Sequence, residues 1–331
     1  MRFAILGAGG WGTAVARTLA NAGHEATLWA RDPKRARAIE GVQENEKYLP
    51  GVRLPIPPLR VASDLGEAIQ SAEAVFLAVP SFAAEGLLRA IAETHPAPLT
   101  IINLSKGLDR ATTRTISELV IDILPNATAF ALSGPSHAEE VGRDVPTAVV
   151  LAGHDLDRGE MLQRAIATPR FRVYLSSDLR GVELCGAVKN VIAIASGISD
   201  GLGYGDNSRG ALITRGLAEL ARFGKSLSIS DATFFGLAGL GDLVATCTSA
   251  HSRNRYVGSR LGAGESLETI LDGMNGIAEG IYATSIVRQM AEEGGIDMPI
   301  TDAVGRLLDG EVAPLQLVDQ IMTRAPKRED G

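Results

Sequence analysis

Lys189 is the residue whose surroundings most favour chemistry. It lies in an otherwise apolar stretch, and lysine side chains are almost never fully buried without a partner. Desolvation and a second cation such as Lys106 would lower the pKa of Lys189 toward neutrality, where an amine can exchange a proton. Gly186 and Ala193 share its helical face and would leave room for a ligand. We therefore predict that Lys189 is a general acid or base; a packed stem with a solvated amine is the alternative.

Lys106 and a serine-containing loop are further candidates at strand ends. Lys106 follows the apolar run Leu99–Asn103, and ligands of doubly wound folds bind beyond the carboxyl ends of strands. Its amine could therefore meet an anion or a carbonyl; a solvated surface lysine is the alternative. In Ser133–Glu140, a helix that starts near Ser136 would present free N–H groups to substrate oxygens. We interpret His137 as a residue of the first turn of that helix rather than as a general base.

A glycine-rich segment precedes a cluster that contains arginine. Asp242 stands within Gly239–Thr248 and could orient the lysine or accept a hydrogen bond from a substrate hydroxyl; a simple turn residue is the alternative. Arg253 offers a planar fork that matches phosphate oxygens, and Ser252 and Asn254 add donors. The cluster predicts an anion site, with a solvated loop as the alternative.

The N-terminal residues predict a dinucleotide-binding loop. The sequence GAGGWG at positions 7–12 matches G-x-G-x-x-G, follows an apolar run and opens a helical stretch. In that setting Gly7 makes the tight turn, Gly9 admits the pyrophosphate, and Gly12 lets the helix pack closely on the strand. A glycine-rich turn without a ligand is the alternative.

Two neighbouring residues bear on the choice between NAD and NADP. An acidic residue about 20 positions after the glycines would bind the ribose hydroxyls of NAD, whereas an arginine would hold the extra phosphate of NADP. The chain has Arg31 followed by Asp32. Because Asp32 precedes Pro33 and a helical stretch, we interpret it as a helix N-cap. The pair favours acceptance of NADP and leaves the preference open.

The elements that must position these residues alternate through the first half of the chain. Strands are expected at Arg2–Leu6, Glu25–Ala30, Ala74–Val79, Leu99–Asn103, Thr128–Leu132, Ala148–Ala152 and Arg170–Tyr174. Helices are expected between them at Thr13–Ala22, Phe82–Glu93, Thr112–Ile123 and Asp155–Ala167. Such alternation predicts an α/β Rossmann domain with a doubly wound, mostly parallel sheet. The proline-rich stretch Asn45–Leu59 is expected to be a connection without elements.

Helical patterns dominate from Asp178 onward, and Asp178 is a good N-cap for a long helix at the junction. We therefore predict a dinucleotide-binding domain over residues 1–177 and an all-α substrate and catalytic domain over residues 178–331. The expected helices are Asp178–Ser196, Asn207–Phe223, Ser230–Phe235, Ser266–Asp272, Ala278–Gly294 and Thr301–Leu308.

Composition narrows the class of protein. The 331 residues carry a net charge of −7, which argues against wholesale nucleic-acid binding and requires a local basic cluster for any anionic substrate. Only two cysteines are present, so a disulfide framework is not expected. No apolar run is expected to reach the length of a membrane span, no signal peptide is recognised, and the scattered histidines match no metal motif. These features predict a soluble cytoplasmic protein without a metal or stable membrane insertion.

Together the motifs resemble the bacterial-type NAD(P)-dependent glycerol-3-phosphate dehydrogenases, from Gly7 to about Arg306. The segments that carry the resemblance are GAGGWGTA, LSKGL, SGPSHAEE, ELCGAVKNVIAIASG, ITRGLAE, GLAGLGDLVATCTSAHSRNR and AEGIYA. The resemblance implies interconversion of sn-glycerol 3-phosphate and dihydroxyacetone phosphate by hydride transfer with NAD or NADP, in support of phospholipid synthesis. It also implies a helical C-terminal domain and a homodimer.

The resemblance assigns roles to individual residues. Lys189 becomes the proton donor and acceptor, with Asp242 beside it in catalysis. Relatives often carry a second basic residue where this chain has Asp32, which weakens the case for tight NADP preference. Substrate contacts are implied for Lys106, Gly134, Ser136, Lys189, Asp242, Ser252, Arg253 and Asn254. Beyond Gly7, Gly9 and Gly12 of the loop, cofactor contacts are implied for Gly10, Trp11, Arg31, Lys106, Ala138, Arg253, Ile277 and Glu279.

Two other functions are consistent with the same two-domain arrangement. One is a different small hydroxyacid dehydrogenase, against which Arg253 favours a phosphate over a carboxylate, although arginine binds both. The other is a nucleotide-sensing protein that has lost its chemistry. The set of Lys106, Lys189 and Asp242 argues against a sensor, which would not need it.

Overall fold

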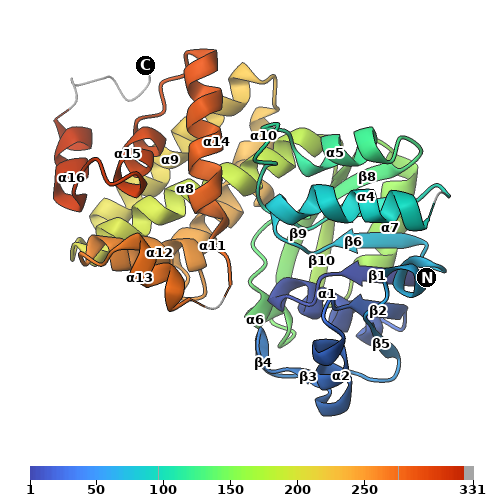
Figure 1. Cartoon of the computed structure of the whole chain (residues 1–331). Coiled ribbons are helices and arrows are strands. Elements are labelled where there is room, and N and C mark those ends of the chain that lie inside the picture. The colour runs from blue at the N-terminus through green and yellow to red at the C-terminus, as the bar shows by residue number, and fades with distance from the viewer. Residues whose placement is uncertain (96, 275, 324–331) are drawn as a thin grey trace. The chain divides into compact units, whose positions relative to one another are not determined.

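Eight strands of the first half pair into one sheet in the computed structural model, which describes residues 1–95, 97–274 and 276–323 (Figure 1). The order across the sheet is β10-β9-β8-β7-β6-β1-β2-β5, and all neighbours are parallel except β8 and β9. This arrangement confirms the doubly wound, mostly parallel sheet. The strands are β1 (Arg2–Leu6), β2 (Glu25–Trp29), β5 (Leu59–Ala62), β6 (Ala74–Leu77), β7 (Thr100–Asn103), β8 (Thr128–Ser133), β9 (Thr147–Gly153) and β10 (Phe171–Ser176).

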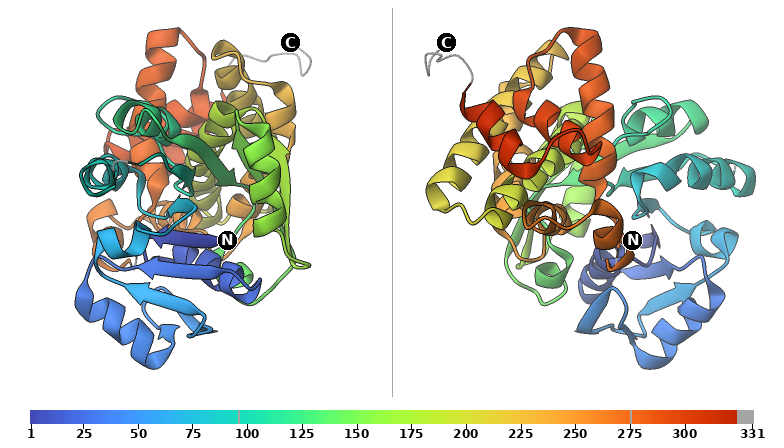
Figure 2. Two further views of the ribbon diagram at one scale, coloured as in Figure 1. Left: turned by 90° about the vertical axis from the view of Figure 1, so that its right-hand side faces the viewer. Right: turned by 60° about the vertical axis from the view of Figure 1, so that its left-hand side comes forward.

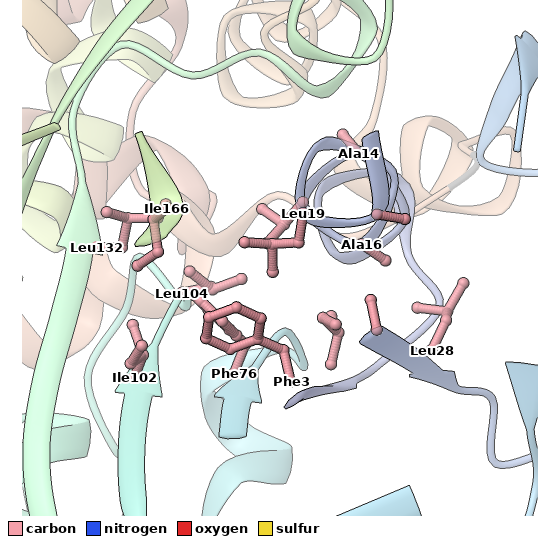
Figure 3. Packing of buried hydrophobic residues seen from close by; sticks show 14 of the residues in the cluster. Phe3, Ala14, Ala16, Leu19, Leu28, Phe76, Ile102, Leu104, Leu132 and Ile166 are labelled. Atoms are coloured by element: carbon pink, nitrogen blue, oxygen red, sulfur yellow. The ribbon is translucent and has the colours of Figure 1, made fainter. Parts of the chain in front are cut away.

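Helices flank this sheet, as two further views show (Figure 2). Leu19 of the first helix lies near Phe3 and Phe76 of the central strands, in a cluster of fully buried side chains (Figure 3). Burial of each such side chain contributes about 1.5–3 kcal/mol, so this face holds the helix against the sheet. The helices of this part are α1 (Gly10–Asn21), α2 (Pro33–Val42), α3 (Leu65–Ile69), α4 (Ala84–Thr94), α5 (Ile116–Ile123), α6 (Ala138–Val141) and α7 (Leu156–Ile166).

The expectation that Asn45–Leu59 lacks elements is wrong. β4 (Leu49–Arg53) pairs antiparallel with the short β3 (Glu44–Asn45) in a separate two-stranded sheet. Pro50 is tolerated because a strand of so small a sheet has an edge where a missing N–H breaks no ladder bond. Gly51 takes a φ of +74°, and buried Leu49 anchors the hairpin. The hairpin was not predicted because its prolines are typical of a connection without strands.

The structure divides into two compact units, and each is described by itself. The N-terminal unit comprises Met1–Ala187 and Ile229–Asp242, and includes α10 (Asp231–Phe235) and a π-helical turn at Leu237–Gly241. The C-terminal unit comprises Val188–Ser228 and the chain from Leu243 onward. The domain boundary between residues 177 and 178 lies at the start of α8 and remains a prediction, and residues 324–331 lie outside the described part.

Every element described in the C-terminal unit is a helix, which confirms the all-α prediction. Glycines let two of these helices touch. A Cβ on Gly197 would lie 2.1 Å from the carbonyl oxygen of Arg255, and one on Gly258 would lie 2.1 Å from that of Ile194. Only glycine permits backbones this close. The helices are α8 (Leu179–Gly201, which begins in the N-terminal unit), α9 (Asp206–Ser226), α11 (Asp242–Thr248), α12 (Arg253–Gly262), α13 (Leu267–Asp272), α14 (Glu279–Gly294), α15 (Pro299–Leu308) and α16 (Pro314–Met322).

α8 bears on two of the expectations. Asp178 caps it as predicted, because its Oδ1 accepts a hydrogen bond from the N–H of Gly181 at 3.0 Å. The expectation that no apolar run is long enough to span a membrane is wrong, because α8 has sufficient length and apolar character. Its apolar window is entirely buried within the protein, which is typical of the core helix of a globular fold.

The stability of the C-terminal unit should depend on the protonation of Glu219. This side chain of α9 is 2% exposed, and its carboxylate accepts hydrogen bonds from the backbone N–H groups of Ile300 and Thr301 at the start of α15. Burial raises the pKa of Glu219 from 4.5 to about 7. Because the folded pKa lies above the unfolded one, the associated stability is complete below pH 4.5 and is lost as pH rises through 7.

We expect the free energy of unfolding to fall by on the order of 3 kcal/mol from this group between those limits. Glu219→Gln cannot ionise and should remove that component of the pH dependence. Urea unfolding of both proteins from pH 4.5 to 8 measures the difference. An identical pH slope in the variant would contradict the assignment to Glu219.

Candidate functional site

The loop between β1 and α1 has the backbone that the glycine motif requires. Gly7 takes a φ of +128°, and a Cβ there would lie 2.3 Å from the carbonyl oxygen of Ala78. A Cβ on Gly12 would lie 2.0 Å from the carbonyl oxygen of Gly7, whereas one on Gly9 would meet no atom within 4 Å. Gly7 and Gly12 are thus required by packing, while Gly9 opens the loop to a ligand.

The first turn of α1 fits an anionic dinucleotide. No side chain caps this helix at Gly9, so its first N–H groups remain available to a pyrophosphate. The buried Nε1 of Trp11 has no hydrogen-bond partner among the described residues. A Cβ on Gly10 would lie 3.4 Å from the Cβ of Ala138, so α6 begins beside this loop. These observations support a cofactor cradle at Gly9, Gly10, Trp11 and Ala138.

Asp32 and Arg31, which follow β2, have different structural roles. The Oδ1 of Asp32 accepts a hydrogen bond from the N–H of Lys34 at 2.9 Å, so Asp32 is the N-cap of α2 as predicted. Arg31 is exposed beside it. Because the carboxylate of Asp32 already caps α2, the exposed guanidinium of Arg31 is suited to binding a ribose phosphate.

Two residues that the sequence did not single out hold the glycine loop from outside. The carbonyl oxygen of Ala8 accepts hydrogen bonds from Arg35 and from the Nδ2 of Asn45, the latter at 3.0 Å. The Arg35 guanidinium lies 4.1 Å from the ring centroid of Tyr48, and burial lowers the pKa of Arg35. These contacts join residues 27 and 37 positions apart, so no local pattern in the sequence signals them.

Lys106 brings three predicted substrate residues together within the N-terminal unit. Its Nζ donates to the carbonyl oxygen of Gly134 at 2.8 Å, to Oγ of Ser136 at 3.1 Å and to Oδ2 of Asp242 at 2.8 Å. The Asp242 side chain is 3% exposed and that of Lys106 is 19% exposed. These contacts fix the Lys106 ammonium at the carboxyl ends of β7 and β8, where doubly wound folds bind ligands.

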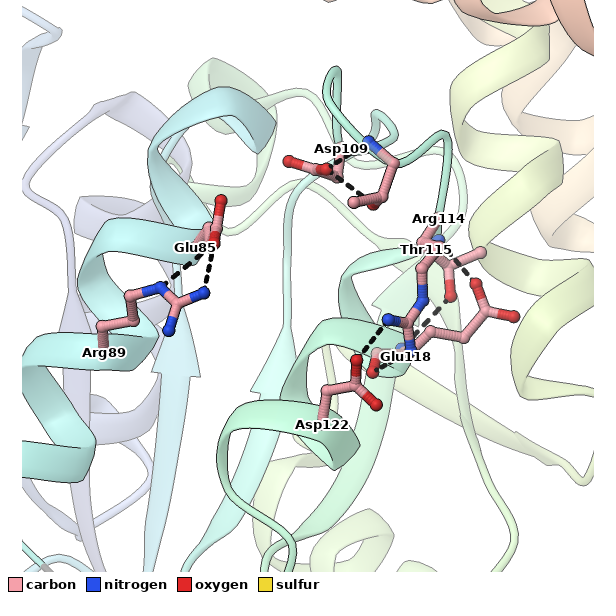
Figure 4. Close-up of polar contacts among 8 residues, drawn as sticks. Glu85, Arg89, Asp109, Arg114, Thr115, Glu118 and Asp122 are labelled. Atoms are coloured by element: carbon pink, nitrogen blue, oxygen red, sulfur yellow. Dashed lines mark hydrogen bonds and ion pairs between the residues drawn. The ribbon is translucent and has the colours of Figure 1, made fainter.

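Side-chain hydrogen bonds fix the segment that follows Lys106 (Figure 4). Oδ2 of Asp109 accepts hydrogen bonds from the N–H and Oγ1 of Thr112 at 2.8 and 2.6 Å. Thr115 and Glu118 form a capping box at the start of α5. The connection between β7 and α5 is therefore ordered by its own side chains.

The loop that contains Ser136 and His137 ends in a helix of four residues, α6. His137 is the N-cap residue of α6 rather than a member of its first turn, and the helix begins two residues after the expected Ser136. Gly134 takes a φ of +126°, where any side chain would be strained. The turn therefore requires glycine at the position whose carbonyl accepts from Lys106.

Lys189 lies in the C-terminal unit and is 3% exposed. Its Nζ donates a hydrogen bond to Oγ1 of Thr246, on α11. Thr246 was not among the residues predicted from the sequence, although its position one helical turn after Asp242 could have indicated it. A buried amine held by a hydroxyl is suited to proton transfer, because its position is fixed and its hydration is low.

The arginine cluster forms the start of α12. Arg253 is exposed, and its guanidinium lies beside Gly276, whose φ of +108° favours glycine. Ser252 caps α12 through a hydrogen bond from the N–H of Arg255 at 3.2 Å. Asn254 is committed to the protein: its Nδ2 donates to Asn190 and its Oδ1 accepts from the N–H of Gly280.

Asn254 consequently joins α8, α12 and α14, and its neighbourhood includes the predicted cofactor residues at the start of α14. Glu279 is the first residue of α14, and Ile277 precedes it by two positions.

In the described part of the chain, no group of three or more metal-ligating side chains is found. Both cysteines are buried and form no disulfide, and burial raises the pKa of the Cys185 thiol.

Comparison with family models accounts for both halves of the chain. Residues 2–158 match the model of the NAD-dependent glycerol-3-phosphate dehydrogenase N-terminus. Residues 178–319 match the model of the C-terminus of the same enzymes. The two matches leave only short segments of the chain unassigned.

Individual relatives match over their full length. Glycerol-3-phosphate dehydrogenase [NAD(P)+] of Chlorobium phaeobacteroides (strain BS1) is 45% identical, over 100% of both chains. The protein of the same name from Nitratidesulfovibrio vulgaris is also 45% identical, over 99% of this chain and 100% of the relative.

Solved structures give a corresponding result. Glycerol-3-phosphate dehydrogenase from Coxiella burnetii superposes with a TM-score of 0.94 at 39% identity, over 98% of this chain and 99% of that one. A ketopantoate reductase from Ralstonia eutropha, at 17% identity and a TM-score of 0.64 over 96% of this chain and 100% of that one, shares the fold alone.

Gly9→Ala tests the cofactor cradle. The φ of −74° at Gly9 suits alanine and its Cβ would meet no protein atom, so stability should change by less than about 1 kcal/mol. The methyl group would occupy space expected for the pyrophosphate, and the Kd for NADPH and NADH should rise at least about tenfold. Fluorescence titration and thermal unfolding measure the two effects.

Gly86→Ala is the matched control, because Gly86 is an exposed α4 residue whose added Cβ also meets no atom. It should leave cofactor binding unchanged. Equal cofactor affinity in Gly9→Ala and the wild type would place the pyrophosphate elsewhere.

Proposed function

The chain belongs to the NAD-dependent glycerol-3-phosphate dehydrogenase family, and from that premise we propose that it interconverts sn-glycerol 3-phosphate and dihydroxyacetone phosphate with NAD or NADP. The observation that carries this proposal is the ion pair of half-buried Lys106 with buried Asp242 at the carboxyl ends of β7 and β8. It fixes the ammonium of Lys106 at the position where a doubly wound fold receives its ligands.

The cofactor would be held by the cradle around α1. Gly7, Gly9 and Gly12 shape the loop, the N–H groups of Gly10 and Trp11 face the pyrophosphate, and Arg31 is exposed for a ribose phosphate. When bound, the nicotinamide supplies or accepts the hydride. The remaining cofactor contacts proposed are Lys106, Ala138, Arg253, Ile277 and Glu279.

Lys189 is proposed to move the proton. In the direction of reduction its ammonium donates a proton to the carbonyl oxygen, and in the direction of oxidation its neutral amine accepts the proton of the hydroxyl. The hydrogen bond to Thr246 holds Nζ in one place, which favours transfer along a single direction.

Substrate oxygens are proposed to meet cations at two places. Lys106, oriented by Asp242, Gly134 and Ser136, would polarise the reacting end of the substrate. Arg253 would bind the phosphate through its planar fork, which fits phosphate oxygens bidentately. Ser252 and Asn254 would contribute chiefly by fixing the start of α12, because their side chains already bond within the protein.

The wider setting is proposed on the family resemblance. A homodimer in the cytoplasm that supplies glycerol 3-phosphate to phospholipid synthesis is consistent with two reduced, buried cysteines. Neither nucleic acid nor a membrane is expected as a partner, since the net charge is −7.

Lys189→Met tests the proton transfer. Loss of a general acid–base group typically lowers turnover by about 10²- to 10⁴-fold, and we expect that loss here with cofactor binding retained. Stopped-flow or steady-state absorbance of NADPH measures turnover, and fluorescence titration measures the cofactor Kd. Turnover within a few-fold of the wild type would remove Lys189 from the mechanism.

Arg253→Ala tests the substrate class. A charge-assisted hydrogen bond contributes about 1.5–3 kcal/mol, so kcat/KM for dihydroxyacetone phosphate should fall about 10- to 150-fold. Reduction of unphosphorylated dihydroxyacetone, which lacks the phosphate, should hardly change. Both substrates are measured at saturating NADPH, after the cofactor affinity of the variant has been determined.

A wild-type enzyme without preference for the phosphorylated substrate would contradict the proposed reaction itself. Equal losses for both substrates at cofactor saturation would contradict only the role of Arg253.

A further inference from the structure

Glu183 is a buried carboxylate in the N-terminal unit that opens the segment ELCGAVKN but has no role in the proposed reaction. It lies on α8 and is 3% exposed. Burial raises the pKa of Glu183, while hydrogen bonds from its neighbours oppose that shift. An apolar side chain of similar size would fill the same space without the cost of desolvating a carboxyl group. The polar atoms of Glu183 therefore serve a purpose other than packing.

The carboxyl group of Glu183 binds both ends of the segment that carries Lys106. Its Oε1 accepts a hydrogen bond from Nδ2 of Asn103, the last residue of β7, at 2.7 Å. The same oxygen accepts from the N–H of Ser117 at 3.1 Å, and Oε2 accepts from the Ser117 hydroxyl, in the first turn of α5. One side chain thus closes the loop between β7 and α5.

Asn103 transmits this constraint to the neighbour of Lys106. Its Oδ1 accepts from the N–H of Ser105 at 2.8 Å, and its Nδ2 also donates to the carbonyl oxygen of Ser105 at 3.2 Å. Oγ of Ser105 in turn donates to the carbonyl oxygen of Val79 at 2.6 Å. The backbone immediately before Lys106 is therefore tied to Glu183 by two consecutive hydrogen bonds.

The aliphatic part of the Lys106 side chain lies beside Gly186 of the same helix, α8. A Cβ on Gly186 would lie 3.6 Å from Cγ and 3.7 Å from Cβ of Lys106, which is ordinary packing distance. Gly186 is three residues after Glu183, on adjacent turns of α8. The stem of Lys106 therefore lies beside the helix that also binds its loop through Glu183.

We propose that Glu183 is a positioning residue that holds Lys106 in the geometry in which its ammonium meets Asp242 and the substrate. The inference rests on the proposed function, because it requires Lys106 to act on the substrate. A displacement of a catalytic group by about 1 Å can lower a rate about 10²-fold, so a loop anchor at this place should influence the reaction strongly.

The test is a double-mutant cycle between Glu183→Leu and Lys106→Met. Leucine fills the site but accepts no hydrogen bond, so kcat/KM for dihydroxyacetone phosphate should fall about 10- to 100-fold. If Glu183 acts through Lys106, the same substitution in the Lys106→Met background should lower kcat/KM at most about twofold, because the effects of substitutions at coupled residues do not add. Full additivity would overturn the proposal.

Glu183→Gln provides the conservative rescue. An amide oxygen can still accept from Asn103 and from the Ser117 N–H, and its NH₂ can donate to the Ser117 hydroxyl. We expect kcat/KM within about threefold of the wild type. A loss as large as that of Glu183→Leu would show that the loop is not held by these hydrogen bonds.

Glu219→Leu is the matched control for general destabilisation. It removes the other buried carboxylate that binds a helix start, in the C-terminal unit, and should lower thermal stability without changing the Lys106 cycle. If Glu183→Leu does not fold, Ser117→Ala removes one bond of the anchor. It should lower kcat/KM about fivefold, and only when Lys106 is present.

The outcomes separate the two proposals. If Lys106→Met alone leaves kcat/KM for dihydroxyacetone phosphate unchanged, the proposed use of Lys106 fails and the inference fails with it. If Lys106→Met is strongly impaired but Glu183→Leu or Ser117→Ala acts equally in both backgrounds, the proposed function stands and Glu183 is not a positioning residue.

Discussion

The hydrogen-bonded ammonium of Lys106 is the interaction on which the N-terminal half of the site depends. Its three acceptors come from two separate segments, since Gly134 and Ser136 follow β8 and Asp242 starts α11. Asp242 is almost fully buried, and a buried carboxylate is tolerated only with a well-placed partner. The hydrogen bonds therefore hold the loops after β7 and β8 and the carboxylate of Asp242 together within the N-terminal unit.

Buried acids recur in this acidic protein, and each is matched by donors. Glu183 is bonded by Asn103 and Ser117 and Glu219 by the start of α15, and half-buried Asp200 is bonded by the guanidinium groups of Arg209 and Arg255 at 2.8 and 2.7 Å. Carboxylates bound in this way organise the interior and do not face a ligand. An anionic substrate can therefore bind locally although the chain carries a net charge of −7.

The sequence predicted features whose signals are local. The glycine loop, the caps at Asp32 and Asp178, and the alternation of strands and helices all depend on spacing within a few residues, and the structure has them. The hairpin of β3 and β4 was missed because its prolines resemble a connection. The anchors at Asn45 and Glu183 were missed because they contact residues 37 to 80 positions away, and no periodicity indicates such pairs.

Two helices of the C-terminal unit pack closely because glycines without side chains lie between them. Gly197 and Gly258 bring the backbones of α8 and α12 into contact, and the Asn190–Asn254 hydrogen bond at 2.8 Å joins the same helices nearer the start of α12. Lys189 precedes Asn190 and Arg253 precedes Asn254 along the chain. The proposed proton donor and the proposed phosphate ligand are therefore carried by two closely packed, hydrogen-bonded helices, which favours a reaction in which the phosphate fixes the position of the carbonyl.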